Sequence, residues 1–297
     1  MMATMLPGQH CGRDDYGWFR QVQTWDGDGV ALLEEHDEFV AHPWHHTVNE
    51  SYGIGLVRYG AYRRRSRGID AVVDANVGFL RFASEEVAVA SFTGEPREVT
   101  YITVDAALTD GLFDAPSDDA AFHVTPEIEL NHQRLLLARR AGADDLTMQH
   151  LAFDVLERAF GQHRGAPRTY SRRSTARARR QLVTDACEVL HTSRHDISLV
   201  ELAATVGCSP FHLSRVFHEI AGMTIPRYRR QLRVHDAVNH IAAGANDLAA
   251  IAAVVGFADH SHMTRSIVAR FDMTPSRLRE LLREPCRDSA LRPVASD

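Results

Sequence analysis

The sequence predicts an α+β fold in two parts: an amino-terminal β-barrel followed by a helical pair, then a carboxy-terminal all-α domain. Three observations predict this. Residues 1 to about 122 hold short apolar and β-branched runs between turn residues. The apolar period becomes helical after Thr125 and Pro126. Beyond residue 182 one helical pattern occurs twice. A chain of 297 residues suits about two such domains.

The amino-terminal domain is expected to span residues 1–160. Strands are predicted where apolar runs such as residues 54–57 (IGLV) and 87–89 (VAV) lie between turns such as residues 26–29 (DGDG). A threonine followed by proline at positions 125 and 126 is typical of a helix start. Residues 142–144 (GAD) interrupt the helical stretch over about 126–160, so two antiparallel helices are predicted there. We expect this pair either to cover the barrel or to form a homodimer.

Charge is distributed unevenly along the chain. Residues 1–165 hold 14 arginines against 26 acidic residues, and residues 166–297 hold 19 against 13, so net charges of −12 and +6 give the −6 of the whole chain. A basic half joined to an acidic half is typical of nucleic-acid-binding proteins, although a solvated basic face is the alternative. Residues 161–180 are rich in Arg and are predicted to be a linker. Residues 181–285 are then predicted to be a DNA-binding domain, and residues 286–297 are predicted to be a flexible tail.

The carboxy-terminal region contains an internal repeat at an offset of 49 residues. The first copy, with Leu199, Leu202, Ala203, Val206 and Gly207, matches the second, with Leu248, Ile251, Ala252, Val255 and Gly256. The match continues at an offset of 50, where residues 213–217 correspond to residues 263–267. Each copy is predicted to be a helix, a glycine-containing turn and a second helix. The predicted helix starts are a capping box of Ser198 and Glu201 and a cap at Ser209 in the first copy, and caps at Asp247 and Asp259 in the second.

The second helix of each copy has a polar face that suits a DNA groove. Apolar Leu213, Val216 and Phe217 are expected in the core, which leaves a face at helical spacing that points to solvent. Arginine can bind guanine through two hydrogen bonds, and Ser, Thr and aromatic side chains can contact other base edges. The predicted DNA-binding residues are Phe211, Ser214, Arg215 and His218 in the first copy, and His260, Ser261, His262, Thr264 and Arg265 in the second.

Residues 182–283 resemble the carboxy-terminal domain of the AraC/XylS family of bacterial transcription regulators. The resemblance lies in "LVELAATVGCSPFHLSRVFHEIAGM", "RYRRQLRVHDAV" and "LAAIAAVVGFADHSHMTRSIVARFDMTPSRL". It implies two helix-turn-helix units joined by a long helix, which bind promoter DNA. Ile267 replaces the usual aromatic of the family and Asp272 the usual glycine.

The segment "HPWHHTVNESYGIGLVRYGAYRRRSRG" resembles the opening strands of the cupin-like effector domain that such regulators commonly carry. The resemblance implies that His42, Trp44, His46 and Tyr52 line a pocket for a small-molecule effector. His42, His45, His46 and Glu50 also resemble a first metal motif of a cupin. The later strand has no second histidine, so a closed metal site would need a distant histidine such as His123. We therefore expect no metal and no cofactor.

The sequence carries no recognisable nucleophile, phosphate loop or paired carboxylates, so we expect no catalysis. No apolar run is long enough to cross a bilayer, so we expect a cytoplasmic protein with no membrane partner. The expected partners are double-stranded DNA, a small-molecule effector, a second copy of the chain and RNA polymerase. A metal-dependent cupin enzyme fused to helices, or a helical module that binds proteins, are the alternative functions.

Overall fold

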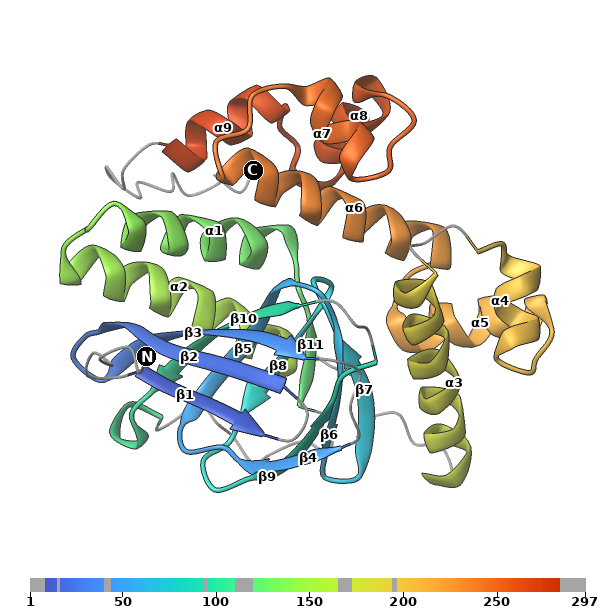
Figure 1. Cartoon of the computed structure of the whole chain (residues 1–297), viewed down its shortest axis with the longest axis horizontal. Coiled ribbons are helices and arrows are strands. Elements are labelled where there is room, and N and C mark those ends of the chain that lie inside the picture. Colours follow the sequence, from blue (N-terminus) through green and yellow to red (C-terminus); the bar gives the residue numbers. More distant parts are fainter. Residues whose placement is uncertain are drawn as a thin grey trace, which may run out of the picture.

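Figure 1 shows a computed structural model, which describes residues 9–14, 17–39, 44–92, 96–109, 120–164, 173–193 and 197–283. The larger sheet has the order β1 (Gln9–Asp14), β2 (Gly17–Asp26), β3 (Val30–Phe39), β10 (Arg97–Val104), β5 (Tyr52–Tyr59), β8 (Val77–Arg81) and β11 (Ala121–His123). The smaller sheet has the order β4 (His45–Val48), β9 (Glu86–Ala90), β6 (Tyr62–Ser66) and β7 (Ile69–Val73). Every strand pairing is antiparallel.

The larger sheet has an apolar core on each of its faces. Because side chains alternate along a strand, one face of the larger sheet packs toward the smaller sheet. The cluster between the sheets, which we call the barrel interior, is Val57, Tyr62, Val73, Phe79, Val99 and Tyr101. A side chain at Gly55 would lie 2.1 Å from the ring of Phe79, so glycine is needed where this ring crosses β5.

The opposite face of the larger sheet is covered by the helical pair, α1 (Pro126–Arg140) and α2 (Asp145–Arg164). The core between them contains Ile54, Leu56 and Ile102 from the sheet and Ile128 and Leu151 from the helices. The Thr125 side chain accepts a hydrogen bond from the Ile128 backbone N–H at 3.3 Å, which confirms the predicted helix start. The short 3₁₀ helix η1 (Ala106–Leu108) lies between β10 and β11 in the sequence.

The carboxy-terminal region consists of α3 (Arg173–Thr192), α4 (Leu199–Thr205), α5 (Pro210–Ala221), α6 (Ile225–Ala242), α7 (Leu248–Val254), α8 (His260–Phe271) and α9 (Pro275–Arg283). The predicted α+β fold, with an all-α carboxy-terminal part, is confirmed. The range predicted as a linker, residues 161–180, differs: α2 continues to Arg164 and α3 begins at Arg173. The reason is that α3 has an apolar side, with Val183, Ala186 and Leu190, that packs on α4 and α5.

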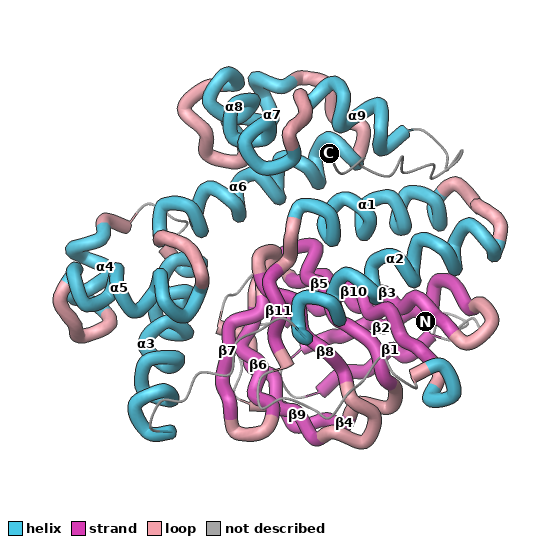
Figure 2. The backbone as a smooth tube through the Cα atoms, turned by 180° about the vertical axis from the view of Figure 1, so that it is seen from behind, coloured by secondary structure: helices cyan, strands magenta, loops and turns pink. Residues whose placement is uncertain are grey.

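The helix α6 joins two separate helical groups. Figures 1 and 2 show α3, α4 and α5 at one end of α6 and α7, α8 and α9 at the other, with α1 between the second group and the sheets. The first group shares a core with Ala61, Val72 and Ala75 of the smaller sheet and its neighbours. The second group shares a core with Leu130 and Leu137 of α1. No helix in the described ranges is long and apolar enough to cross a membrane.

Candidate nucleic-acid interface

The first helix-turn-helix unit is formed by α4 and α5. Ser198 accepts a hydrogen bond from the Glu201 backbone N–H at 3.2 Å, and the Glu201 carboxylate accepts one from the Ser198 backbone N–H at 2.9 Å. This pair is the predicted capping box. The turn passes through Gly207, whose φ of 72° favours glycine, and the Ser209 side chain caps α5 by accepting from the His212 backbone N–H at 3.2 Å.

The second unit, α7 and α8, repeats this construction with aspartate caps. Asp247 accepts from the backbone N–H groups of Ala249 and Ala250 at 2.9 and 3.1 Å, and Asp259 accepts from that of His262 at 2.7 Å. The turn glycine, Gly256, has a φ of 79°, close to that of its equivalent in the first unit. Both aspartate caps that the sequence predicts are therefore present.

The two second helices bury the same positions. Residues 211–220 and 261–270 show one identical order of buried, half-buried and exposed side chains. The equivalent helix ends also agree, since Gly222 after α5 and Asp272 after α8 both adopt left-handed backbone conformations, with φ of 66° and 55°. The repeat in the sequence thus corresponds to two copies of one structural unit.

The predicted DNA-binding residues lie on the solvent-facing side of α5 and α8. Phe211 is 80 % exposed, which is unusual for a large aromatic side chain. Of the remaining predicted residues, the exposed ones are Arg215, His218, His260, Ser261 and Arg265, and the half-buried ones are Ser214, His262 and Thr264. The ring of His262 contacts that of Phe257 edge-on at 5.2 Å, so the turn of the second unit holds this histidine in place.

A shallow cleft adjoins the first of these faces. It has a volume of about 510 Å³ and is lined by Ala178, Arg179 and Leu182 of α3 together with His212 and Arg215 of α5. Arg179 also forms an ion pair with Glu219. The helix α3 therefore adds a basic residue, Arg179 of the Arg-rich stretch, beside the first unit. His212 also lines this cleft, although it is not among the predicted DNA-binding residues.

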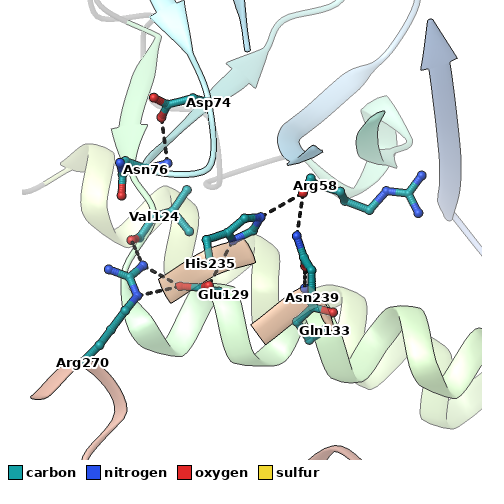
Figure 3. Close-up of polar contacts among 9 residues, drawn as sticks. All are labelled: Arg58, Asp74, Asn76, Val124, Glu129, Gln133, His235, Asn239 and Arg270. Atoms are coloured by element: carbon teal, nitrogen blue, oxygen red, sulfur yellow. Dashed lines mark hydrogen bonds and ion pairs between the residues drawn. The ribbon is translucent and has the colours of Figure 1, made fainter. Parts of the chain in front are cut away.

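One buried carboxylate forms the central polar contact between the amino-terminal domain and the second unit. Glu129 of α1 is 2 % exposed, and its Oε2 accepts from Arg270 Nε at 2.7 Å while its Oε1 lies 3.0 Å from His235 Nδ1 (Figure 3). Arg270 NH2 also donates to the Val124 carbonyl at 3.2 Å. One side chain of α1 thus holds α6 and α8 together.

The same contact extends to strand β5. The Arg58 carbonyl oxygen lies 3.0 Å from His235 Nε2 and accepts from Asn239 Nδ2 at 2.8 Å (Figure 3). Gln133 of α1 donates to Asn239 Oδ1 at 2.6 Å. We call this set the Glu129 network; its members are Arg58, Val124, Glu129, Gln133, His235, Asn239 and Arg270.

His235 is held in its charged form by this geometry. Its Nε2 faces a carbonyl oxygen, which only accepts, and its Nδ1 faces a carboxylate, so protons on both nitrogens are favoured. Burial alone would lower the pKa of His235, but the hydrogen bond and charge of Glu129 outweigh it, and the pKa is raised. Burial likewise acts to raise the pKa of Glu129, yet Arg270 and His235 hold it below its ordinary value.

A second buried carboxylate contacts the first unit. Asp74 is fully buried; it accepts from the Asn76 backbone N–H at 2.8 Å, lies 2.8 Å from His191 Nε2 of α3, and accepts from the hydroxyl of Tyr228 on α6. We call these four residues the Asp74 network. Nearby, Arg63 of β6 donates to Asp185 of α3 at 2.7 Å. Each half of the carboxy-terminal region therefore has its own polar contact with the amino-terminal domain.

The residues predicted to bind an effector do not gather at one place. His42 lies outside the described residues. Trp44 stacks on Arg65, with the guanidinium carbon 4.0 Å from the ring centroid, and His46 lies on the exposed strand β4. Tyr52 packs against the core under α1 and α2 instead. Among the described residues no three His, Cys, Asp or Glu side chains converge in a way that could hold a metal ion.

Comparison with known proteins identifies the helical region. Residues 202–281 match the family model of a helix-turn-helix domain. The chain is 29 % identical over 100 residues to the bifunctional transcriptional activator/DNA repair enzyme AdaA of Bacillus subtilis (strain 168), which covers 34 % of this chain and 46 % of that relative. It is 28 % identical over 102 residues to the probable transcription factor PqrA of Proteus vulgaris, which covers 33 % of this chain and 84 % of the relative. The match to AdaA thus spans less than half of that protein.

Two solved structures are similar in part. ToxT from Vibrio cholerae O395 is 12 % identical with a TM-score of 0.34, and the match covers 89 % of this chain and 98 % of that chain. An AraC-type transcriptional regulator from Chromobacterium violaceum is 22 % identical with a TM-score of 0.33, and the match covers 36 % of this chain and 97 % of that chain. Residues 202–281 are thus similar in sequence to a helix-turn-helix domain, and the relatives that share this region are described as a transcriptional activator and a probable transcription factor.

Proposed function

We propose that the protein is an AraC-type transcription regulator in which α5 and α8 read promoter DNA and the amino-terminal domain modulates this binding in response to a small-molecule effector. The observation that carries the proposal is the repeated exposed face, on which Arg215 and Arg265 occupy equivalent positions. Arginine on such a face can donate two hydrogen bonds to guanine in the major groove. The other predicted residues of both faces surround these two arginines.

The helix α6 supports the reading of one site by both units. Its 18 residues span about 27 Å at 1.5 Å per residue. Successive major grooves on one side of DNA lie about 34 Å apart. Two units joined by such a helix suit neighbouring grooves when their second helices project outward or the DNA bends. Because the two faces differ in sequence, the site read by one chain is asymmetric.

The Glu129 and Asp74 networks support a regulatory role for the amino-terminal domain. An effector that changes this domain changes the contacts that hold both units, and so shifts the equilibrium between arrangements that bind DNA differently. His42, Trp44, His46 and Tyr52 remain the predicted effector residues. Leu146 and Phe153, which are 77 % and 36 % exposed on α2, support a homodimer through the helical pair. RNA polymerase is the further partner that such a regulator would contact.

The test is binding to DNA from upstream of the protein's own gene at several salt concentrations. Arg215→Ala and Arg265→Ala are each expected to weaken specific binding by about 1–3 kcal/mol and to relax discrimination at one base position. Arg277→Ala is the matched control, because Arg277 is exposed, lies on α9 and not on α5 or α8, and pairs with Glu280 at 3.1 Å. This control should leave sequence discrimination unchanged.

Equal binding by the wild type and both reading-face variants, across a library of genomic DNA as well as the upstream fragment, would contradict base reading by α5 and α8. A steep fall of affinity with salt, without discrimination between sequences, would indicate contacts to phosphates alone.

A further inference from the structure

The cleft beside α5 is mainly basic, because three of its five lining residues are Arg or His. Arg179 comes from α3, and His212 and Arg215 come from α5. Arg215 also belongs to the exposed face of α5, so the cleft is continuous with the surface of the proposed base reading. His212 lies in the first turn of α5, where the helix dipole favours an anion. The cleft therefore has the charge that suits a phosphate group.

The packing of α3 explains why Arg179 lies beside α5. Val183, Ala186 and Leu190 are buried in the core that α3 shares with α4 and α5 (Figure 1). Arg179 precedes Val183 by four residues, so it continues the packed side of α3 past the end of this core. When the second helix of a unit lies in a major groove, an element beside that helix faces the phosphates at the edge of the groove. Arg179 is placed to contact them.

Arg179 forms its ion pair with an acidic residue on the same side of α5 as the reading residues. Glu219 follows Arg215 by four residues, so the two side chains are neighbours on the helix surface. The side chains of Arg179 and Glu219 are 25 % and 47 % exposed. An ion pair exposed to this degree contributes little to stability. A phosphate can therefore replace the Glu219 carboxylate as the partner of Arg179 at little cost to the fold.

The internal repeat extends to the helix that precedes each unit. At an offset of 51, buried residues of α3 correspond to buried residues of α6: Val183 to Val234, Ala186 to Ala237 and Leu190 to Ile241. The basic positions of the cleft recur as well, and the pairs are Arg179 and Arg230, His212 and His262, and Arg215 and Arg265.

The acidic position of the cleft does not recur. Glu219 corresponds to Ala269 at the offset of 50 that relates α5 to α8. An arginine stands at the position of Arg179 in both copies, although the second copy has no glutamate for it to pair with. This pattern favours a role for the arginine outside the ion pair, and a shared DNA backbone supplies the same phosphate ligand to both units.

We propose that the cleft between α3 and α5 binds a phosphate of the DNA backbone, with Arg179 and His212 as its donors, and that Arg179 exchanges Glu219 for this phosphate when DNA binds. A guanidinium edge matches a phosphate with two parallel hydrogen bonds. The contact fixes the position of α5 along the groove but carries no sequence information. The proposal rests on the proposed function, in which α5 enters the major groove, and it adds α3 to the interface.

The test measures binding of the full chain at several salt concentrations to the upstream DNA fragment and to a duplex of the same length with scrambled sequence. Arg179→Gln should weaken binding to both duplexes by about threefold to tenfold, and should reduce the slope of log K against log salt by about 0.9, the value for one phosphate. The ratio of the two affinities should not change. Base reading can fail on the upstream fragment while the phosphate contact is still measured on the scrambled duplex, so the two proposals are tested separately.

Arg177→Gln is the matched control. Arg177 is exposed on α3 and precedes Arg179 by two residues, so its side chain leaves the helix about 200° away from that of Arg179. It is not among the described residues that line the cleft. The salt slope of this variant should stay within about 0.3 of the wild-type slope.

Glu219→Gln tests the exchange of partners. Removal of this carboxylate should strengthen binding to both duplexes, because Arg179 then has no competing partner. The gain should be at least about threefold larger in the wild-type background than in Arg179→Gln, which has no arginine to release. Each single variant should melt within about 3 °C of the wild type, since the ion pair is exposed.

Three results would overturn the proposal. The first is that Arg179→Gln keeps the wild-type salt slope on both duplexes. The second is that Glu219→Gln weakens DNA binding as Arg179→Gln does, which would make the ion pair a structural link between α3 and α5. The third is that Glu219→Gln strengthens binding equally with and without Arg179, which would mean that this carboxylate acts only by repelling DNA.

Discussion

Replacement of Glu129 by Gln should loosen the second helix-turn-helix unit from the amino-terminal domain. The substitution keeps the shape of the side chain but leaves His235 and Arg270, each with a side chain that is 6 % exposed, without their shared counter-charge. Removal of one partner from a buried pair costs about 3–5 kcal/mol. His235 can lose its proton, and Arg270 keeps the Val124 carbonyl at 3.2 Å, so we expect a loss of about 3 kcal/mol.

Urea unfolding measured with two signals can detect this loss. The 3 tryptophans all lie in the first 44 residues, so their fluorescence reports on the barrel, whereas circular dichroism at helical wavelengths reports largely on the helices. In Glu129→Gln the helical signal should be lost at lower urea than the fluorescence signal. The control is Glu127→Gln, because Glu127 lies two residues away in the same helix but is exposed; its loss should stay below about 1 kcal/mol.

The opposite result is that in Glu129→Gln the fluorescence and circular dichroism transitions coincide and keep the urea midpoint of the wild type. This result would mean that the buried carboxylate contributes nothing to the association of α1 with α6 and α8.

Three further predictions concern pH, a helix end and the barrel. The pKa of His235 in the folded protein is raised above 6.5, so the stabilisation by its charged form is fully present below that pH and should be lost as pH rises through the folded-state pKa. Tm measured from about pH 6 to 9 for the wild type and His235→Gln should therefore converge at high pH. Asp272→Gly should stabilise the chain by about 0.5–1 kcal/mol in urea unfolding, since Asp272 has a φ of 55°; a loss of stability would show that its side chain makes a needed contact. Gly55→Ala should destabilise by about 1–3 kcal/mol in the same assay, because a Cβ would lie 2.1 Å from the Phe79 ring, and an unchanged midpoint would show that this ring moves freely.

Local sequence patterns predicted the parts of the structure that local physics determines. The capping pairs at Ser198 and Asp259, the turn glycines and the alternation of buried and exposed positions in α5 depend on residues a few positions apart. The start of α1 at Thr125 and Pro126 has the same origin. The predicted positions of these features therefore agree with the structure.

Contacts between distant segments could not be predicted in this way. Glu129 and His235 are 106 residues apart, and His235 and Arg58 are 177 residues apart, so no periodicity relates them. In the sequence Glu129 and His235 stand among other polar residues, such as Asn131 and Asp236, and nothing local distinguishes the ones that are buried. The direction of the buried Arg64 side chain likewise depends on the register between β6 and β9, in which Arg64 pairs with Val89. The sequence does not define this register, because residues 63–65 are all arginine.

The helix α6 is attached to the amino-terminal domain by two groups of contacts: Tyr228 near its start belongs to the Asp74 network, and His235 and Asn239 toward its end belong to the Glu129 network. Tyr228 and Asn239 are 11 positions apart, which is about 16 Å along the helix axis. Attachment at two points of one rigid rod is bivalent: when one contact opens, the other keeps its partner at a high effective concentration and favours rebinding. Full release of the two helix-turn-helix units from the amino-terminal domain therefore requires both groups of contacts to open together. Under the proposed regulation, we expect DNA binding to change steeply with effector concentration.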